Sequence, residues 1–408
     1  MVLSNYKKLI AFVLTLVLLI SCAPLLGHTV YAAELSNYYV SLKLDGSIQV
    51  NLYLKYNNQD GDPSDKAVSL SYPDETVISG KKKTDEYTYA GLATESVSAD
   101  EADYLGNIDL SGYKKISCRV APAQINEKII LEKWNGKDWE TIKSFTVKEI
   151  AKKYVDVFSE KSGDDAAKIT NLCKSILSYG DDAYNYFKTQ SGYGFLDSKE
   201  TLSSGGALAE SYYNEPLAAS AETAFNIIKT SSSAFINAEV SPAAAYTVAG
   251  VSFICASNTN VRYSLRIDES EFAASESALE AEMSFTKQNA TLAALAGNSA
   301  DKVNIRFEDL KTSENGFRCY YIRVKNIPAQ CLGEEYQVTV KKDGEAVYSF
   351  KGSAMAYANK VFNEGFIVEN SGSLAGDNSE EKLELEKKMM VSAYRYYEAA
   401  IAYFGEFE

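Results

Sequence analysis

Residues 175–187 have the sequence SILSYGDDAYNYF, and residues 392–404 have the sequence SAYRYYEAAIAYF. In and just before the first stretch, apolar residues recur at the spacing of one helical face. Adding 217 to their numbers gives a second set, in which four of the six residues are identical. We predict an amphipathic helix in each half, packed by this stripe against the sheet of its own half; an aromatic platform for a ligand is the alternative. The two sets are Leu172, Ile176, Tyr179, Ala183, Tyr186 and Phe187, and Met389, Ala393, Tyr396, Ala400, Tyr403 and Phe404.

Shorter matches lie upstream of both helices and keep the same order along the chain. Their spacings are 206, 205 and 211 residues, and the spacing changes where loops are expected. An ordered series of matches indicates an internal repeat, so we predict two copies of one unit. The matches are Pro122-Ala123-Gln124 with Pro328-Ala329-Gln330, Ser144-Phe145 with Ser349-Phe350, and Val50 and Leu54 with Val261 and Leu265.

Turn signals show that each unit is rich in sheet. Alternating apolar and polar residues flank Asp45-Gly46, Asn135-Gly136 and Asp343-Gly344, which are typical turn pairs of β-hairpins. Helices follow the strands. Thr146-Val147-Lys148-Glu149 is typical of a capping box and predicts a helix to about Phe158, and a second helix is predicted at about 165–188.

These patterns predict an α+β fold of two homologous β-sandwich-like units, each followed by a helical pair. The first unit spans residues 34–190 and the second spans residues 234–408. Residues 191–233 contain glycine pairs, serine runs and one helix-like stretch at about 216–229. We interpret them as a Gly/Ser-rich linker that contains a short helix.

Composition excludes several classes of function. The 408 residues are 46% hydrophobic and 24% charged, which is typical of a folded globular protein. Lysine and arginine total 41 against 55 acidic residues, so a net charge of −14 disfavours nucleic acid and anionic membranes as partners. The one histidine is His28, which lies in a predicted export signal. A mature chain without histidine cannot build a Ser-His-Asp triad, a zincin site or a haem ligand set, and we expect no cofactor.

Residues 1–33 have the layout of a secretory signal peptide. Lys7 and Lys8 precede an apolar run from Leu9 to Ile20 that is short for a membrane span, and Val30-x-Ala32 fits ordinary cleavage. The alternative is a lipid anchor on Cys22, because residues 19–22 fit a bacterial lipobox. We favour release, and therefore expect an extracellular protein with no transmembrane span in the mature chain.

Five cysteines remain after Cys22, and none forms a C-x-x-C pair. The odd number and the spacings indicate neither a full disulfide framework nor a zinc site. We expect buried thiols that pack as small apolar groups, with a single disulfide as the open alternative. The five are Cys118, Cys173, Cys255, Cys319 and Cys331.

Four segments resemble an uncharacterised extracellular module that recurs in secreted and surface proteins of gut clostridia. In that module a strand-rich segment ends in a helix of the type Tyr-Gly-x-x-Ala-x-x-Tyr-Phe. The resemblance covers about residues 46–404 and implies an architecture and a compartment, without a particular chemistry. The second copy departs from the pattern, because Tyr397 stands at the position of Gly180. The segments are residues 135–158, 175–187, 320–340 and 392–404.

Two groups of acidic residues were considered for chemistry. Asp60, Asp62 and Asp65 lie in a stretch rich in oxygen ligands and are a weak calcium candidate, although the end positions of an EF-hand loop do not fit. Two carboxylates would suffice for a glycosidase without histidine. Asp181 and Asp182 are adjacent on a predicted helix and point about 100° apart, so we interpret them as solvated acids.

Trp134 and Trp139 flank Asn135-Gly136 at a predicted hairpin tip, where burial is difficult, and are our predicted binding residues. The alternative is that they fold back over the sheet as edge packing. We predict a secreted non-catalytic binding or scaffold protein of a bacterial surface, with a carbohydrate or a cell-surface protein as its partner. An extracellular carboxylate-only hydrolase and a structural envelope component are the alternatives.

Overall fold

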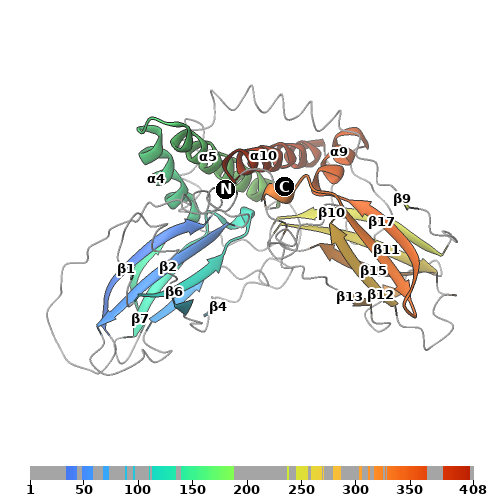
Figure 1. Ribbon diagram of the computed structural model, residues 1–408, viewed down its shortest axis with the longest axis horizontal. Coiled ribbons are helices and arrows are strands. Elements are labelled where there is room, and N and C mark those ends of the chain that lie inside the picture. Colours follow the sequence, from blue (N-terminus) through green and yellow to red (C-terminus); the bar gives the residue numbers. More distant parts are fainter. Residues whose placement is uncertain are drawn as a thin grey trace, which may run out of the picture. The chain divides into compact units, whose positions relative to one another are not determined.

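Most strands and helices of the chain are placed in a computed structural model (Figure 1). The chain divides into two compact units. The first unit contains the described residues up to Tyr184, and the second contains those from Asn185 onward. The described residues are 34–43, 48–57, 68–72, 88–89, 95–96, 110, 113–134, 139–187, 237–238, 245–255, 259–268, 270, 279–285, 303–305, 311–312, 317–324, 327, 329–364 and 380–404.

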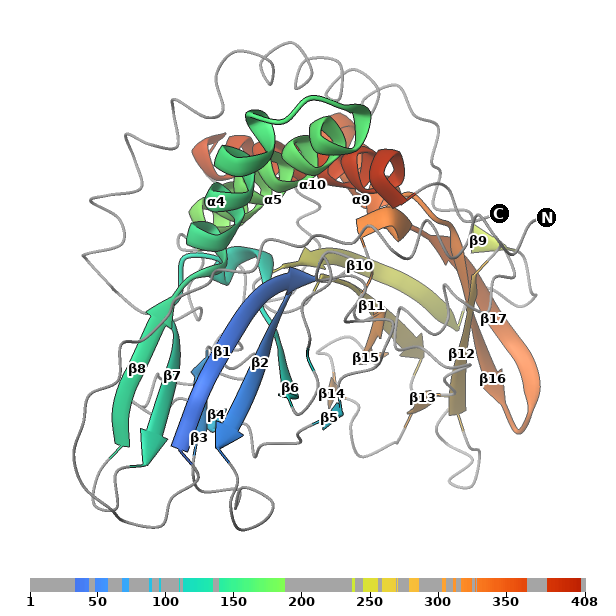
Figure 2. The same ribbon diagram turned by 60° about the vertical axis from the view of Figure 1, so that its left-hand side comes forward.

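The first unit has two antiparallel sheets of four strands each. One has the order β1-β2-β6-β5 and the other has the order β4-β3-β7-β8. The two sheets lie one over the other in both views (Figures 1 and 2). The strands are β1 (Glu34–Lys43), β2 (Gln49–Asn57), β3 (Val68–Tyr72), β4 (Thr88–Tyr89), β5 (Glu95–Ser96), β6 (Tyr113–Arg119), β7 (Ile129–Trp134) and β8 (Trp139–Phe145).

The second unit also has two antiparallel sheets, with the orders β10-β11-β15-β14 and β13-β12-β16-β17-β9. The ring of Tyr263 on β11 lies 4.8 Å from that of Phe350 on β17, so the two sheets share a core. The strands are β9 (Asn237–Ala238), β10 (Tyr246–Ile254), β11 (Asn260–Asp268), β12 (Leu279–Phe285), β13 (Val303–Ile305), β14 (Lys311–Thr312), β15 (Phe317–Val324), β16 (Tyr336–Lys342) and β17 (Glu345–Gly352).

A pair of helices follows the last hairpin of each unit, as Figure 2 shows for α4 with α5 and for α9 with α10. The chain is therefore α+β, as the sequence predicted. A 3-10 turn precedes the last hairpin of each unit, at Pro122–Gln124 in the first unit and at Ala329–Cys331 in the second. The helices are α4 (Val147–Ser159), α5 (Asp164–Phe187), α9 (Ala354–Glu364) and α10 (Glu380–Phe404).

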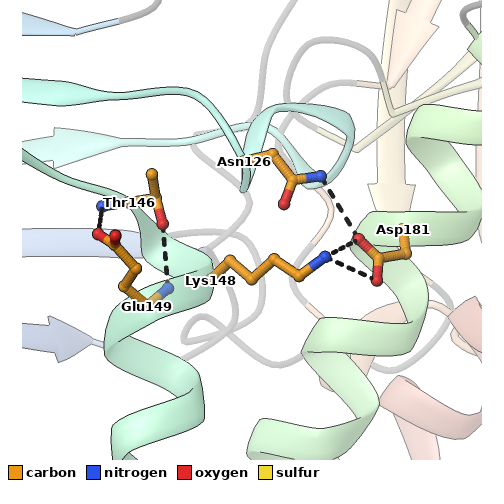
Figure 3. Close-up of polar contacts among 5 residues, drawn as sticks. All are labelled: Asn126, Thr146, Lys148, Glu149 and Asp181. Atoms are coloured by element: carbon orange, nitrogen blue, oxygen red, sulfur yellow. Dashed lines mark hydrogen bonds and ion pairs between the residues drawn. The ribbon is translucent and has the colours of Figure 1, made fainter. Parts of the chain in front are cut away.

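The predicted hairpins and the predicted helix start are confirmed. Asp343 and Gly344 have φ of 52° and 85°, so both turn residues are left-handed, as a type I′ hairpin turn requires. Thr146 Oγ1 accepts from the backbone N–H of Glu149 at 3.0 Å, and the Glu149 carboxylate accepts from the backbone N–H of Thr146 at 2.8 Å. This capping box satisfies backbone donors that the first turn of α4 leaves open (Figure 3).

Local hydrogen bonds around the 3-10 turns recur at a constant spacing of 207 residues. The hairpins keep this spacing, because Ile129 pairs with Phe145 and Tyr336 pairs with Gly352. The predicted match of Ser144-Phe145 with Ser349-Phe350 is therefore wrong by two residues. A shift of two residues keeps each side chain on the same face of the sheet, so the alternation of apolar and polar residues does not reveal it. The recurring bonds are Lys148 N to Ile125 O with Met355 N to Leu332 O, Glu127 N to Gln124 O with Glu334 N to Cys331 O, and Glu149 N to Thr146 Oγ1 with Ala356 N to Ser353 Oγ.

The predicted helical stripes are buried, except that Tyr403 is half-buried and the side chain of Phe404 lies outside the described residues. The elements against which these stripes pack differ from the prediction. α10 packs on the turn at 329–331 and on α9, and α9 packs on β10. The final helix of the second unit therefore reaches its sheet mainly through the turn and the first helix. A further finding is that no helix among the described ranges has the length and apolar character of a membrane span.

Candidate functional site

Trp134 and Trp139 are directly opposite each other in the register of β7 and β8. They form the last described pair of this hairpin, and residues 135–138 between them lie outside the described residues, as do the positions of the two indole side chains. The backbone therefore places the two predicted binding residues at neighbouring positions. Their role in binding stays a prediction.

The other predicted ligand positions lie outside the part of the chain that the structure describes. These are Cys22, the lipidation candidate, and Asp60, Asp62 and Asp65, the calcium candidate. Within the described ranges, no three His, Cys, Asp or Glu residues are grouped so that they could hold a metal ion. Both assignments stay predictions.

Four of the five cysteines that follow Cys22 are buried thiols without a disulfide, as expected. Burial raises the pKa of the Cys118 thiol, and likewise that of Cys331, to about 12. A thiol with such a pKa is almost entirely protonated at neutral pH and is a poor nucleophile. These cysteines therefore act as packing groups; they are Cys118, Cys173, Cys255 and Cys331.

Asp181 is held in an ion pair on the inner side of the first helical pair (Figure 3). The Lys148 ammonium donates to its two carboxylate oxygens at 2.7 and 3.0 Å, and the Asn126 amide donates at 3.4 Å. The two charged side chains are only 11% and 20% exposed. The interpretation of Asp181 as a solvated acid is therefore wrong, because helix packing brings a lysine from α4 against α5. This cluster fastens α4, α5 and the turn after Gln124 together.

A buried hydroxyl–carboxylate pair joins the two helices of the second unit. The Tyr357 hydroxyl on α9 donates to the Glu386 carboxylate on α10, and both residues are buried. The Tyr357 ring also stacks on Phe253 of β10, with 6.1 Å between ring centroids. Burial, and then the neighbouring negative charge of Glu386, raises the pKa of Tyr357. Tyr357 therefore contacts both β10 of the sheet and Glu386 of α10, and so connects the sheet, α9 and α10.

Two further tyrosines meet in the core of the second unit. The hydroxyls of Tyr263 and Tyr336 lie 2.5 Å apart, and burial raises the pKa of both residues. A Cβ at Gly352 would lie 2.0 Å from the Tyr263 hydroxyl oxygen, so the glycine leaves room for this ring. These tyrosines are packing residues of the shared core, which is one reason for the high tyrosine content.

The sequence analysis did not identify a basic row on β11. The burial of this strand alternates, with Val261, Tyr263 and Leu265 turned to the core, whereas Arg262 and Arg266 lie on the other face and are half-buried. Arg262 donates to Ser252 Oγ on β10 at 3.2 Å. The alternation of residues 260–268, NVRYSLRID, is a period-two signal that would have found both arginines.

A scan of the chain against protein-family models found no match. Searches of curated proteins and of solved structures likewise returned no significant similarity.

Proposed function

We propose that this chain is a secreted, non-catalytic binding or scaffold protein of a bacterial surface, built from two copies of one β-rich unit with a terminal helical pair. We further propose that it belongs with the extracellular clostridial module that its segments resemble. The proposed order is a signal peptide at 1–33, a first copy at 34–190, a linker at 191–233 and a second copy at 234–408.

The observation that carries this proposal is the common construction of the two units. Four strands of each sheet follow the same order in both units, and the hydrogen bonds around the 3-10 turns recur 207 residues apart. Unrelated folds often share a strand order, whereas individual capping and turn bonds that recur at one spacing are what a copied sequence predicts. A duplication explains both.

Tyr397 stands where the first copy has Gly180, and the packing around the two residues supports the duplication. In the first unit Gly180 accommodates Ile125, because a Cβ there would lie 2.1 Å from Ile125 Cδ1. In the second unit Tyr397 takes the helix position, and Gly333 of the turn accommodates it; a Cβ at Gly333 would lie 2.6 Å from Tyr397 Cζ. Each interface therefore pairs one glycine with one large side chain, although Gly333 lies one position after Leu332, the counterpart of Ile125.

The kind of residue that recurs favours binding or scaffolding over catalysis. The residues shared by the two halves are buried aliphatic, alanine and tyrosine side chains of the helices and strands. They hold a framework together and contribute no nucleophile, acid or base. The two copies have therefore kept the same structural framework. We expect ligand contacts on the surface segments that this framework holds, such as the hairpin with Trp134 and Trp139.

Glycan-array binding by the mature chain tests this function. We expect binding to a glycan that is lost in Trp134→Ala and Trp139→Ala, whereas Trp134→Phe and Trp139→Phe, which keep an aromatic face, retain most of it. Turnover of a polysaccharide panel would instead support the carboxylate-only hydrolase. Failure of both assays would leave the structural envelope component.

Export is tested separately by cell fractionation. A released protein appears in the medium, and Cys22→Ala leaves that distribution unchanged. If the wild-type chain is retained on membranes and Cys22→Ala releases it, the lipid anchor replaces free secretion.

A further inference from the structure

The outer face of the sheet β10-β11-β15-β14 carries three of the seven arginines of this chain. Arginine is scarce here, and all but Arg119, Arg306 and Arg395 lie in β11 and β15. Val261, Tyr263 and Leu265 identify the inner face, because all three are 0% exposed. Tyr263 also contacts the opposite sheet through Tyr336. Arg262 and Arg266 therefore lie on the outer face, where they are half-buried.

The register adds two more basic positions to this face. Arg323 on β15 pairs with Arg262, and Cys319 pairs with both Arg266 on β11 and Lys311 on β14. Cross-strand partners share one face of a sheet, so three adjacent strands place basic residues on the same side. We call Arg262, Arg266, Lys311 and Arg323 the arginine face.

The first unit repeats this face only in part, because its register places Lys55, Lys115 and Arg119 on the corresponding side of the sheet β1-β2-β6-β5. The repeat spacing of 211 residues in β2 and β11 places Asn51 at the position of Arg262 and Lys55 at that of Arg266. Asn51 is 4% exposed and accepts from Gln49 and Ser117 side chains at 2.8 Å. The pair of Arg262 and Arg323 is therefore particular to the second unit, since the corresponding pair of the first unit is Asn51 and Ser117.

We propose that the arginine face binds an acidic polysaccharide whose sugars carry carboxylates; this ligand class rests on the proposed binding function. Guanidinium groups match carboxylates bidentately. Residues four apart on a strand are separated by about 13 Å and neighbouring strands by about 5 Å, so these basic positions extend over an area of the sheet instead of meeting at one point. Such an array engages the repeated charges of an extended polymer better than one small anion.

The positive charge that would attract an acidic polysaccharide lies at the arginine face. The chain as a whole has a net charge of −14, which repels polyanions at long range, so attraction depends on short contacts at the arginine face. Arg262 is oriented by its hydrogen bond to Ser252 across the strand pair. Asp268 is the acidic residue at the end of the outer row of β11 and marks one limit of the patch.

The test uses the complete mature chain and polygalacturonate, with dextran and xylan as neutral probes, in affinity electrophoresis and calorimetry. The double variant Arg262→Gln/Arg266→Gln is expected to weaken polygalacturonate binding at least tenfold. Arg262→Lys/Arg266→Lys keeps the charge and the strand packing, and is expected to retain part of the affinity. The matched control Lys128→Gln/Lys153→Gln removes the same charge from exposed positions of the first unit and should change binding less than twofold. Circular dichroism and the melting temperature confirm that each variant is folded.

Four outcomes overturn the inference. They are the absence of polygalacturonate binding, binding that the arginine substitutions do not weaken, equal weakening by the lysine control, and equal competition by single-stranded DNA, which would show polyanion binding without a glycan preference. Neutral-glycan binding that depends on Trp134 but not on Arg262 would leave the proposed function standing while removing the acidic ligand. Failure to bind any glycan would count against both.

Discussion

Single contacts at the 3-10 turns decide where large and small side chains are placed. Gly180 lies on the buried side of α5, and the Ile125 side chain occupies the space that a Cβ would take. Ile125 is itself 0% exposed, so it has little room to move away. A glycine inside a helix costs about 1 kcal/mol relative to alanine, and here close packing is the compensation.

We predict that Gly180→Ala lowers the free energy of unfolding by about 1–3 kcal/mol through overpacking, measured by urea denaturation. In an Ile125→Ala background the clash is absent, and the same substitution should be neutral or stabilising because of helix propensity. An equal cost in both backgrounds would show that Ile125 is not the reason for the glycine.

Buried thiols make stability sensitive to alkaline pH. Burial raises the pKa of Cys118 from 9.0 to about 12. Above pH 9 the unfolded chain loses this proton whereas the folded chain keeps it, so unfolding releases a proton and stability falls as pH rises. We predict that wild-type stability declines between pH 8 and 10 and that Cys118→Ala reduces this decline by about 1 kcal/mol. The measurement is urea denaturation at both pH values, and an identical pH dependence of the two proteins would refute it.

At the scale of the elements, the two last hairpins protect their outer edges in different ways. β9 covers β17 in the second unit, where Asn237 pairs with Phe350, a residue 1% exposed. Among the described strands, β8 ends its sheet in the first unit. There a register shift makes Ile142 an extra residue, and Lys143 pairs with the buried Leu131 on the core side. A bulge and an inward-facing lysine are both protections against edge pairing.

We therefore predict that Lys143→Val increases self-association of the chain, because it removes the charge that keeps a second strand from pairing with β8. Light scattering after size-exclusion chromatography measures this. Lys143→Glu is the control, since it keeps a charge at the position and should not associate more than the wild type. Equal mass for wild type and Lys143→Val over a concentration series would contradict the prediction.

At the scale of the whole molecule, the first unit contains its two sheets, the turn at 122–124, α4, and α5 up to Tyr184. The fragment 34–190 keeps every strand of the first unit together with α4 and α5. We predict that this fragment folds alone with a cooperative thermal transition, as a domain with its own core should. Calorimetry checks this, and a non-cooperative melt would show that the fragment is not a domain.

Local signals in the sequence determined much of the fold. The Asp343-Gly344 turn, the Thr146 and Glu149 capping box and the buried helical stripes were predictable, because each depends on residues a few positions apart. The sequence also shows that residues 34–408 contain no histidine. These features follow from backbone geometry and chemical composition, which do not depend on the rest of the fold.

Tertiary structure alone decided four other features. It showed that Lys148 from α4 neutralises Asp181 on α5, that the last helix packs on the 3-10 turn and the first helix, and that the hairpins repeat at 207 residues instead of 205. It also grouped Arg262 with positions about 60 residues away on β15. Such contacts arise when distant segments pair and pack, and a pattern of period 2 or 3.6 gives the face of a residue without giving its neighbour.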